Sequence, residues 1–252
     1  MNHWDKQAIE VKDDNIVNIA DLPQRELENF YICKYLKPDM SILEVGCGNG
    51  YSTNVFRNLV KHVDAFDISA AMIERAKKSY GEINNKFYVG NAIELNDMPN
   101  HYDMVLCVRV LINISPDYHL AALRNIAKAV APGGCLILVE GFTFSYQALN
   151  ILRETVGLDA INPPIFNRLV SKNDAFPVLD DEFILTGSFH LGNYDYLTRI
   201  FYPRLISPGN VKYNTTFHYQ AAELTKLYNP DCFRNISRVQ GYVFTRIILD
   251  SK

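Results

Sequence analysis

The pattern of apolar and polar residues alternates between strands and helices over the first 140 residues of this 252-residue chain. Five short apolar runs have the length of buried strands, at 42–45, 62–67, 87–89, 102–107 and 135–140. Between them, three segments have the composition or the apolar spacing of helices, at 53–60, 70–78 and 118–130. Strands that alternate with helices form βαβ units, so the pattern predicts the parallel half of a doubly wound α/β sheet.

Residues that commonly start or end helices stand at the predicted ends of these elements. Pro23 stands near the start of a helix predicted over 22–32, in front of the first strand. Ser69 is placed to cap the helix that follows the second strand. The run Ala131-Pro132-Gly133-Gly134 ends the last of these helices before the fifth strand begins.

Residues 142–252 differ in character, because they contain 18 Phe and Tyr residues against 12 aromatic residues in the first 141. A helix is predicted over 146–156, and two further strands are expected to complete a sheet of about seven mostly parallel strands, at 183–189 and 239–247. The proline-rich segment 162–168 and the aromatic, basic segment 190–204 are too unusual for ordinary connections. We expect both to be walls of a lid over a ligand site rather than packing insertions.

Composition and charge narrow the class of partner. A net charge of -3 and a pI near 6.1 favour neither nucleic acid nor an anionic membrane. The five cysteines are scattered without a Cys-x-x-Cys pair, which is typical of a reducing compartment. The first residues lack the apolar core of a signal peptide, and no apolar run approaches a membrane span. We therefore expect a cytoplasmic protein, of an oligomeric state that the sequence does not indicate.

The first strand ends in a turn with glycines at alternate positions, Gly46, Gly48 and Gly50. Such a turn lets backbone N–H groups and a helix N-terminus approach a ligand without interference from a Cβ atom. A dinucleotide-binding turn requires a third glycine where Tyr51 stands. Glu44, two residues before the turn, is placed to face an ammonium group. The turn therefore favours a ligand that combines a nucleoside with an amino acid.

The sequence from Ile42 to Gly50, I-L-E-V-G-C-G-N-G, resembles the first motif of the class I S-adenosyl-L-methionine-dependent methyltransferases. The helix–Pro-Gly-Gly–strand junction is similar to that family as well. The resemblance covers residues 41–141 and implies a Rossmann-like fold, S-adenosyl-L-methionine as cofactor and methyl transfer to oxygen or nitrogen. It implies a helical cap over 1–40 and a methyltransferase domain over 41–252, in which 142–252 complete the sheet and the acceptor site.

The resemblance assigns cofactor contacts to residues that follow the first four strands. Asp67 ends the second strand, where a carboxylate can accept hydrogen bonds from both ribose hydroxyls. Asn91 stands where the family has an acidic residue against the adenine amino group, and a neutral amide makes a weaker bond. Arg25 or Tyr31 is placed to reach the cofactor carboxylate, or lies outside the site. The other expected contacts are Gly46, Cys47, Gly48, Asn49, Ile68, Met72, Ala92, Ile93 and Cys107.

The acceptor is expected beyond the carboxyl end of the fourth strand, where Arg109 and Asn113 stand. Asn113 is a poor base, so any role is in positioning, and Cys107 has no evident His partner that would make it a nucleophile. Alignment and a dry site can supply much of the catalysis, because sulfonium is an excellent leaving group. No metal site is predicted. Further acceptor contacts are expected from Asn167, Tyr194 and Arg199.

Two other functions stay open at this stage. An NAD(P)-dependent oxidoreductase shares the strand, the glycine turn and Asp67. A non-catalytic module that binds S-adenosyl-L-methionine is consistent with the neutral residues Asn91 and Asn113. Residues 149–158 also resemble, loosely, methyltransferases of bacterial surface polysaccharide or sugar modification, so a small polar acceptor such as a sugar or glycan precursor is one expectation.

Overall fold

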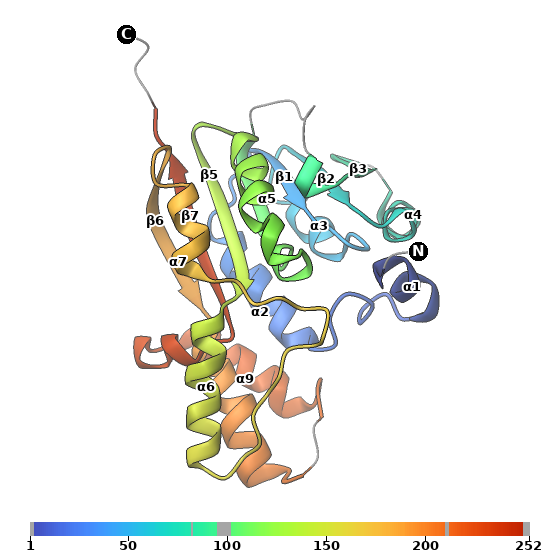
Figure 1. Ribbon diagram of the computed structural model, residues 1–252. Helices are drawn as coiled ribbons and strands as arrows, with labels where there is room; N and C mark the ends of the chain where they lie inside the picture. The colour runs from blue at the N-terminus through green and yellow to red at the C-terminus, as the bar shows by residue number, and fades with distance from the viewer. Residues whose placement is uncertain (1–2, 82, 95–101, 210–211, 249–252) are drawn as a thin grey trace.

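The computed structural model describes residues 3–81, 83–94, 102–209 and 212–248. At its centre is a seven-stranded sheet in the order β3-β2-β1-β4-β5-β7-β6 (Figure 1). The strands are β1 Ser41–Val45, β2 His62–Asp67, β3 Asn85–Val89, β4 Tyr102–Val108, β5 Val130–Gly141, β6 Phe183–His190 and β7 Val239–Arg246. The first five are parallel, and β7 runs antiparallel to both neighbours. This sheet confirms the predicted doubly wound fold of about seven strands.

Helices and single turns connect the strands. The helices are α1 His3–Glu10, α2 Leu22–Cys33, α3 Tyr51–Phe56, α4 Ala70–Tyr80, α5 Pro116–Lys128, α6 Thr143–Thr155, α7 Lys172–Ala175, α8 Gly192–Asp195, α9 Thr216–Leu227 and the π-helix η4 Tyr196–Ile206. The 3-10 turns are η1 Ala92–Glu94, η2 Leu111–Asn113, η3 Phe176–Val178 and η5 Asp231–Ile236. The predicted helix over 53–60 is shorter, since α3 ends at Phe56, and α1 was not predicted.

Side chains cap both α2 and α4, and of these two caps the sequence predicted Ser69. The Ser69 hydroxyl accepts a hydrogen bond from the Met72 backbone N–H at 3.1 Å, at the start of α4. Asp21 caps α2 by accepting from the Gln24 N–H at 3.2 Å, one residue after Pro23. Each cap satisfies a backbone donor that a helix leaves free at its first turn. The sequence therefore fixes where α2 and α4 begin, and with them the residues they turn toward the sheet.

Two apolar cores lie on the two faces of the sheet. Leu43 and Val105 enter the core that α5 covers, whereas Ile42, Met104 and Leu106 enter the core that α2 and α4 cover. Neighbouring residues of a strand point to opposite faces, so a parallel strand covered on both sides is apolar throughout. This is why β1 and β4 appear in the sequence as continuous apolar runs.

The C-terminal part adds a helical layer beyond the sheet. Figure 1 shows α6 and α9 together below the sheet, while α1 lies to the right, near α4. The segment 190–204, which was expected to be a lid wall, instead forms α8 and most of η4. Among the described residues, no helix is long and apolar enough to cross a membrane.

Candidate active site

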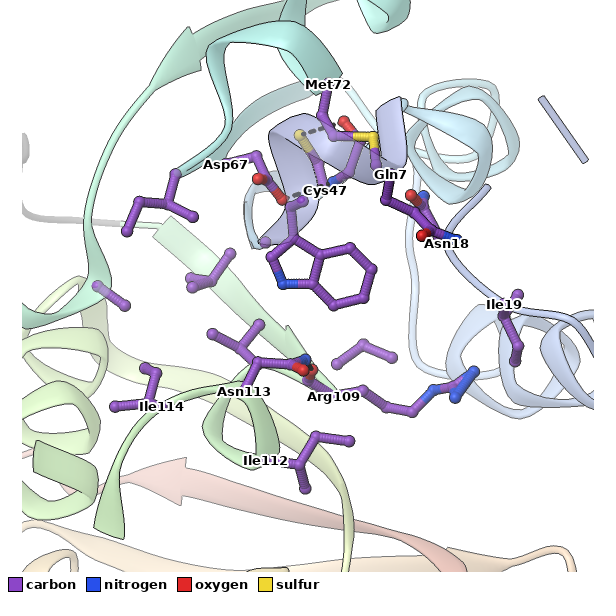
Figure 2. Close-up of a pocket in the computed structure, with 18 of the residues that line it drawn as sticks. Gln7, Asn18, Ile19, Cys47, Asp67, Met72, Arg109, Ile112, Asn113 and Ile114 are labelled. Carbon is purple, nitrogen blue, oxygen red and sulfur yellow. Dashed lines mark hydrogen bonds between the residues drawn. The ribbon is translucent and has the colours of Figure 1, made fainter. Parts of the chain in front are cut away.

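A cavity of about 750 Å³ opens where β1, β2 and β4 end (Figure 2). Its floor is made by the glycine turn and by the residues that follow these strands. Its walls come from α1, residues 16–20, one side of α2 and the loop around Phe166. Of the residues expected to bind the cofactor, those that line it are Arg25, Glu44, Gly46, Cys47, Gly48, Asp67, Ile68, Met72, Asn91, Ala92 and Ile93. Their roles toward a cofactor stay predictions.

The glycine turn is built for close approach. Gly46, Gly48 and Gly50 all have positive φ, at 71°, 54° and 79°, a conformation that glycine adopts without strain. A Cβ atom on Gly48 would lie 2.3 Å from the Asn18 side chain. The N–H groups of Gly46 and Cys47 donate to the Phe66 carbonyl at 2.8 and 2.9 Å. These two N–H groups therefore already have partners within the protein, so the turn is poorly suited to bind a pyrophosphate. The expectation that they face a ligand was wrong.

Asp67 accepts hydrogen bonds from the backbone around it, including the glycine turn. Its carboxylate accepts hydrogen bonds from the Gly48 N–H and the Ser69 N–H, both at 2.9 Å. Burial raises the pKa of Asp67, and these hydrogen bonds oppose the rise. A carboxylate oxygen accepts more than one hydrogen bond, so Asp67 keeps acceptor capacity toward the cavity. That capacity matches the two hydroxyls of a ribose.

Glu44 is a buried carboxyl that lines the cavity without a cationic partner among the described residues. It accepts one hydrogen bond, from the Thr53 hydroxyl at 2.5 Å. Burial raises its pKa to about 7, and the Thr53 hydrogen bond opposes this rise. A positive group placed beside Glu44 would restore its ionised form. The site therefore fits an ammonium group of a ligand.

Arg25 is a buried cation in the same cavity, and it has hydrogen-bond donors without partners. It is 5% exposed, yet its Nε and Nη1 atoms have no hydrogen-bond partner, while Nη2 donates to the Asn15 carbonyl at 2.5 Å. The guanidinium lies 3.5 Å over the ring of Tyr51, directly after the glycine turn. Buried polar atoms are normally paired, and unpaired donors on a residue that lines a cavity fit a ligand carboxylate. Tyr31, the other residue considered for this role, instead donates to the Thr225 carbonyl at 3.2 Å and stacks on Phe189.

Asn91 lines the cavity after β3, as the sequence predicted. Its side-chain oxygen accepts a hydrogen bond from the Ile93 N–H at 3.0 Å, which fixes the turn η1. The same oxygen has a second lone pair for an outside donor. Asn91 is therefore compatible with an adenine amino group, through a neutral hydrogen bond.

The backbone after β4 is held by a buried carboxyl that the sequence had not assigned to the site. Glu140, at the end of β5, accepts hydrogen bonds from Val110 and Leu111 N–H groups at 2.9 and 2.7 Å. Burial raises the pKa of Glu140 to about 8, against the effect of these bonds. Arg109 adopts a φ of +56°, and its N–H donates to the Val139 carbonyl at 2.7 Å. Glu140 thus shapes the turn that carries Arg109 and Asn113 into the cavity.

Asn113 and Asn167 both line this end of the cavity. The Asn113 amide donates to the Arg109 carbonyl at 2.7 Å, and its oxygen is buried without a partner. The loop of Asn167 is fixed against η2, because the Arg168 N–H donates to the Ile112 carbonyl at 2.6 Å. Across the mouth, Phe166 lies 4.1 Å from the ring of His3 and 6.0 Å from that of Trp4. Segment 162–168 therefore does form a wall, and it closes against α1.

Two residues expected to contact the cofactor do not line the cavity. Asn49 is buried beneath the N-terminal segment, where its amide donates to the Asp14 carbonyl and its oxygen accepts from Asn18, both at 2.8 Å. Cys107 is fully buried within the sheet, with its thiol 3.9 Å from Glu140. Burial and the Glu140 charge raise the pKa of this thiol, which also speaks against a nucleophile. β4 continues to Val108, so the first cavity residue after Cys107 comes one position later.

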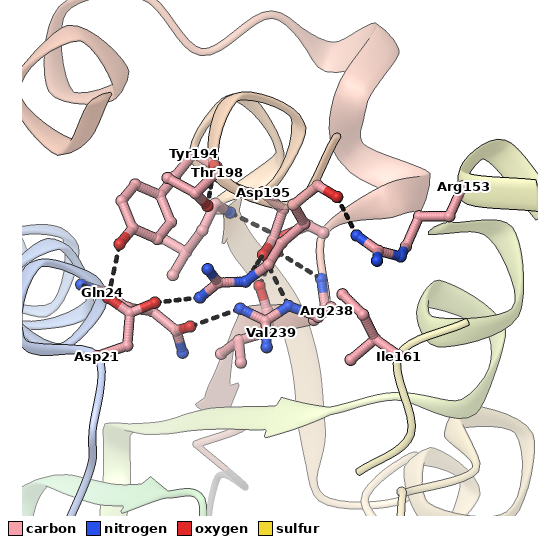
Figure 3. A network of polar contacts seen from close by, with 12 residues as sticks. Asp21, Gln24, Arg153, Ile161, Tyr194, Asp195, Thr198, Arg238 and Val239 are labelled. Carbon is pink, nitrogen blue, oxygen red and sulfur yellow. Dashed lines mark hydrogen bonds and ion pairs between the residues drawn. The ribbon is translucent and has the colours of Figure 1, made fainter. Parts of the chain in front are cut away.

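The prediction that Tyr194 and Arg199 contact the acceptor is corrected, since neither lines the cavity. Tyr194 is fully buried and donates to Asp21 at 2.6 Å, and Arg199 pairs with the other oxygen of Asp21 (Figure 3). Arg238 completes the network by donating to Asp195 at 2.8 Å. These aromatic and basic residues tie η4 to the start of α2. They stabilise the fold that carries Arg25 rather than contact a ligand.

Sequence reasoning missed several cavity residues. Glu28 and Asn29 line it from α2, three and four positions after Arg25 and therefore on the same helix face. Their polarity on a helix expected to bury apolar residues was the available signal. Trp4 and Asn18 carried no such signal, because their place depends on how the N-terminal segment folds over the glycine turn.

Part of the chain is similar to known proteins. Residues 42–134 match a family model described as "Methyltransferase domain". Carboxy-S-adenosyl-L-methionine synthase from Aeromonas salmonicida is 26% identical over 132 residues, which are 50% of this chain and 53% of that protein. The enzyme of the same name from Vibrio cholerae is 32% identical over 45% of this chain and 49% of its own length. The chain thus matches about half the length of these relatives.

Solved structures share the fold at low identity. A chain of the Haloferax volcanii complex with the Trm112 methyltransferase activator matches with a TM-score of 0.66 at 15% identity, over 98% of this chain and 99% of that one. The N-methyltransferase NodS from Bradyrhizobium japonicum, solved with S-adenosylhomocysteine, gives 0.59 at 13% identity over 99% and 100%. The matched segment also contains Glu44, the glycine turn, Asp67 and Asn91. Residues 42–134 are therefore similar to a methyltransferase domain, and the chain shares the fold of these solved structures.

Proposed function

We propose that this chain transfers the methyl group of S-adenosyl-L-methionine to an oxygen or nitrogen of a small polar acceptor. The observation that carries the proposal is the pair of unmatched buried charges in one cavity, Glu44 and Arg25. They fit the ammonium and the carboxylate of an amino acid, while Asp67 fits the ribose of a nucleoside. A ligand that joins the two is needed to match all three.

The order of these residues follows the sheet. Asp67 stands at the end of β2, Glu44 at the end of β1, and Arg109 and Asn113 beyond β4. Because β1 lies between β2 and β4, a ligand bound at Asp67 and Glu44 extends toward Arg109. The acceptor is therefore expected between η2 and the Phe166 loop.

The residues at that end align an acceptor rather than ionise it. When bound, the cofactor supplies a methyl group on a positively charged sulfur, which needs little activation. The buried Asn113 oxygen can accept a hydrogen bond from an acceptor O–H or N–H and so orient its lone pair. His3, Trp4 and Phe166 cover the mouth and help to exclude water. Residues 149–158, which suggested a sugar acceptor, belong to α6 and the residues after it and do not line the cavity.

A second candidate comes from the named relatives, which are called carboxy-S-adenosyl-L-methionine synthases. On that alternative the chain modifies the cofactor itself rather than an acceptor. The oxidoreductase alternative has less support, because the glycine-turn N–H groups of Gly46, Cys47 and Gly48 are used inside the protein. The non-catalytic alternative differs from the main proposal only in turnover.

Ligand-dependent unfolding tests the proposal. S-adenosylhomocysteine should stabilise the protein, by about 2.7 kcal/mol at a hundredfold excess over its dissociation constant, and NADH should not. Mass spectrometry after incubation with S-adenosyl-L-methionine and an extract of small molecules then separates the outcomes. A methylated acceptor together with S-adenosylhomocysteine supports methyl transfer, and a carboxylated cofactor supports the second candidate. Stabilisation by NADH alone would overturn both.

A further inference from the structure

Arg109 has an unusual backbone for a residue with a large side chain. Its φ of +56° lies in the left-handed region, which non-glycine residues rarely adopt. Hydrogen bonds hold it there from both sides, from its own N–H to Val139 and from the Asn113 amide to its carbonyl. Glu140 fixes the three residues that follow. Strained conformations that the fold actively maintains cluster at functional sites.

The side chain of Arg109 crosses the cavity with most of its donors unused. Figure 2 shows it extending from the turn after β4 toward Ile19. Its Nε atom lies 3.4 Å from Glu28, and the other oxygen of Glu28 already accepts from Gln24 at 2.8 Å. Among the described residues, the two terminal nitrogens of Arg109 have no hydrogen-bond partner. An arginine presents these nitrogens as a fork that matches a carboxylate.

Two arginines and one carboxylate line this side of the cavity, while Glu140, the other carboxylate near Arg109, is fully buried under the turn with a pKa raised to about 8. Arg25 and Arg109 both line it, and Glu28 is the carboxylate that they share on α2. Glu44 and Asp67 belong to the ends of β1 and β2. If Arg25 binds the carboxylate of the cofactor, the donors of Arg109 are left for a second anion. Its position beyond β4 places that anion on the acceptor.

The surroundings of Arg109 suit an apolar body attached to this anion. Ile112 and Phe166 line the same end, and the backbone bond between Arg168 and Ile112 keeps the two segments together. Trp4 adds a second ring, which meets that of Phe166 edge to face. Ligand pockets are lined mainly by apolar and aromatic side chains with a few polar groups that fix orientation, so apolar walls beside one charged fork suit a small ligand with an apolar body and one anionic group.

We infer that the acceptor of the proposed methyl transfer is a small carboxylate with a ring or other flat apolar body, and that Arg109 binds its carboxylate. This inference rests on the proposed function and gives the acceptor a chemical class. It separates the roles of the two arginines, with Arg25 on the cofactor and Arg109 on the acceptor. The same geometry would accept a phosphate, so the test includes one.

Benzoate serves as the probe, and benzamide as its neutral analogue of the same shape. Calorimetry measures their binding to the protein saturated with S-adenosylhomocysteine, with phenyl phosphate as a third ligand. Arg109→Met removes the fork, Arg109→Lys keeps the charge, and Arg168→Met removes an exposed arginine nearby that does not line the cavity. S-adenosylhomocysteine affinity is measured in each variant, which reports whether the variant is folded.

Benzoate should bind roughly tenfold or more tightly than benzamide, because it alone accepts charge-assisted bonds from the fork. Arg109→Met should remove this preference, Arg109→Lys should retain part of it, and Arg168→Met should change nothing. Equal binding of benzoate and benzamide, no binding of either, or a preference that survives Arg109→Met would overturn the inference. So would an Arg109-dependent preference for phenyl phosphate over benzoate. Failure of S-adenosylhomocysteine to bind the unmodified protein would instead overturn the proposed function.

Discussion

The cavity and the network beside it both contain buried arginines and carboxylates, but only in the network does each carboxylate lie beside an arginine, although the Nε of Arg199 has no hydrogen-bond partner. There, Arg199 pairs with Asp21, and Arg238 donates to Asp195 at 2.8 Å. In the cavity, Arg25 keeps two donors unpaired and Glu44 has no cation beside it among the described residues. A balanced buried pair can be explained by the fold alone. A buried charged residue that lines a cavity without such a partner implies a ligand.

The two regions are joined through α2, which contributes to both. Asp21 caps the helix and belongs to the network, while Arg25 and Glu28 line the cavity one and two turns later. The network therefore fixes the helix from which the cavity takes its charges. Changes in the network should act on stability first, and changes in the cavity on ligand binding.

The largest effect is expected from Asp21→Ala. It leaves Arg199 buried beside no close carboxylate except Asp195, 4.0 Å from its Nε, and also removes the cap of α2. The free energy of unfolding should fall by about 3–5 kcal/mol, as is usual when one partner of a buried pair is removed. Urea unfolding measures this. Asp231→Ala, which removes an exposed carboxylate that pairs with Arg234 and His190, is the control and should change little. Equal losses in the two variants would contradict a special role for the network.

Asp67→Ala should weaken S-adenosylhomocysteine binding by roughly 1.5–3 kcal/mol, the range for hydrogen bonds to a charged group. Calorimetry compares it with Asp64→Ala, on the same strand, whose carboxylate accepts from the Tyr102 hydroxyl at 2.7 Å outside the cavity. Asp64→Ala should leave this affinity unchanged. If Asp67→Ala does so too, Asp67 only holds the glycine turn through Gly48 and Ser69.

Glu44 should make ligand affinity depend on pH. Its pKa in the folded protein is raised to about 7, so the carboxyl is largely neutral at pH 6 and ionised at pH 8. Because an ammonium group binds the ionised form, S-adenosylhomocysteine affinity should rise roughly tenfold over this range. The free energy of unfolding of the ligand-free protein should change the other way. The buried, protonated carboxyl stabilises the fold at low pH, and this contribution is lost as the pH rises through 7. Glu44→Gln should flatten both profiles, and an unchanged slope in that variant would assign the pH dependence elsewhere.

The smallest effect is expected from Asn91→Asp. The aspartate keeps the oxygen that accepts from Ile93, and adds a charge toward the adenine amino group. Affinity for S-adenosylhomocysteine should improve by about 1 kcal/mol, the difference between a neutral and a charge-assisted hydrogen bond. Adenosine should gain equally in the same titration. A gain for neither ligand would place the adenine away from Asn91.

The features that the sequence predicted well are local ones. Strand periodicity, the Ser69 cap, Pro23 at the start of α2 and the glycine turn each depend on residues a few positions apart. Asp67 and Asn91 could be placed because each follows a strand whose end was clear from its apolar run. Here local preference and the final fold agree, which is the condition for reading structure from sequence.

The features that it missed depend on distant contacts. Arg199 was expected to bind the acceptor because it stands among aromatic residues, but its partner Asp21 lies 178 positions away. Cys107 was expected at a strand end, and β4 continues one residue further. A shift of one position turns a strand residue to the opposite face. No local pattern distinguishes Arg25, which faces the cavity, from Arg199, which is paired.

The central claim is that a buried charge that lines the cavity without an ion-pair partner marks the ligand site, and the variants Arg25→Met and Arg199→Met test it directly. Both remove the guanidinium of a buried arginine, 5% exposed for Arg25 and 6% for Arg199, and leave an unbranched side chain. For each, calorimetry gives the affinity for S-adenosylhomocysteine and urea unfolding gives the stability without ligand. Arg25→Met should weaken binding roughly tenfold or more with stability almost unchanged, and Arg199→Met should do the reverse. If Arg25→Met lowers stability and leaves the affinity intact, the claim is contradicted.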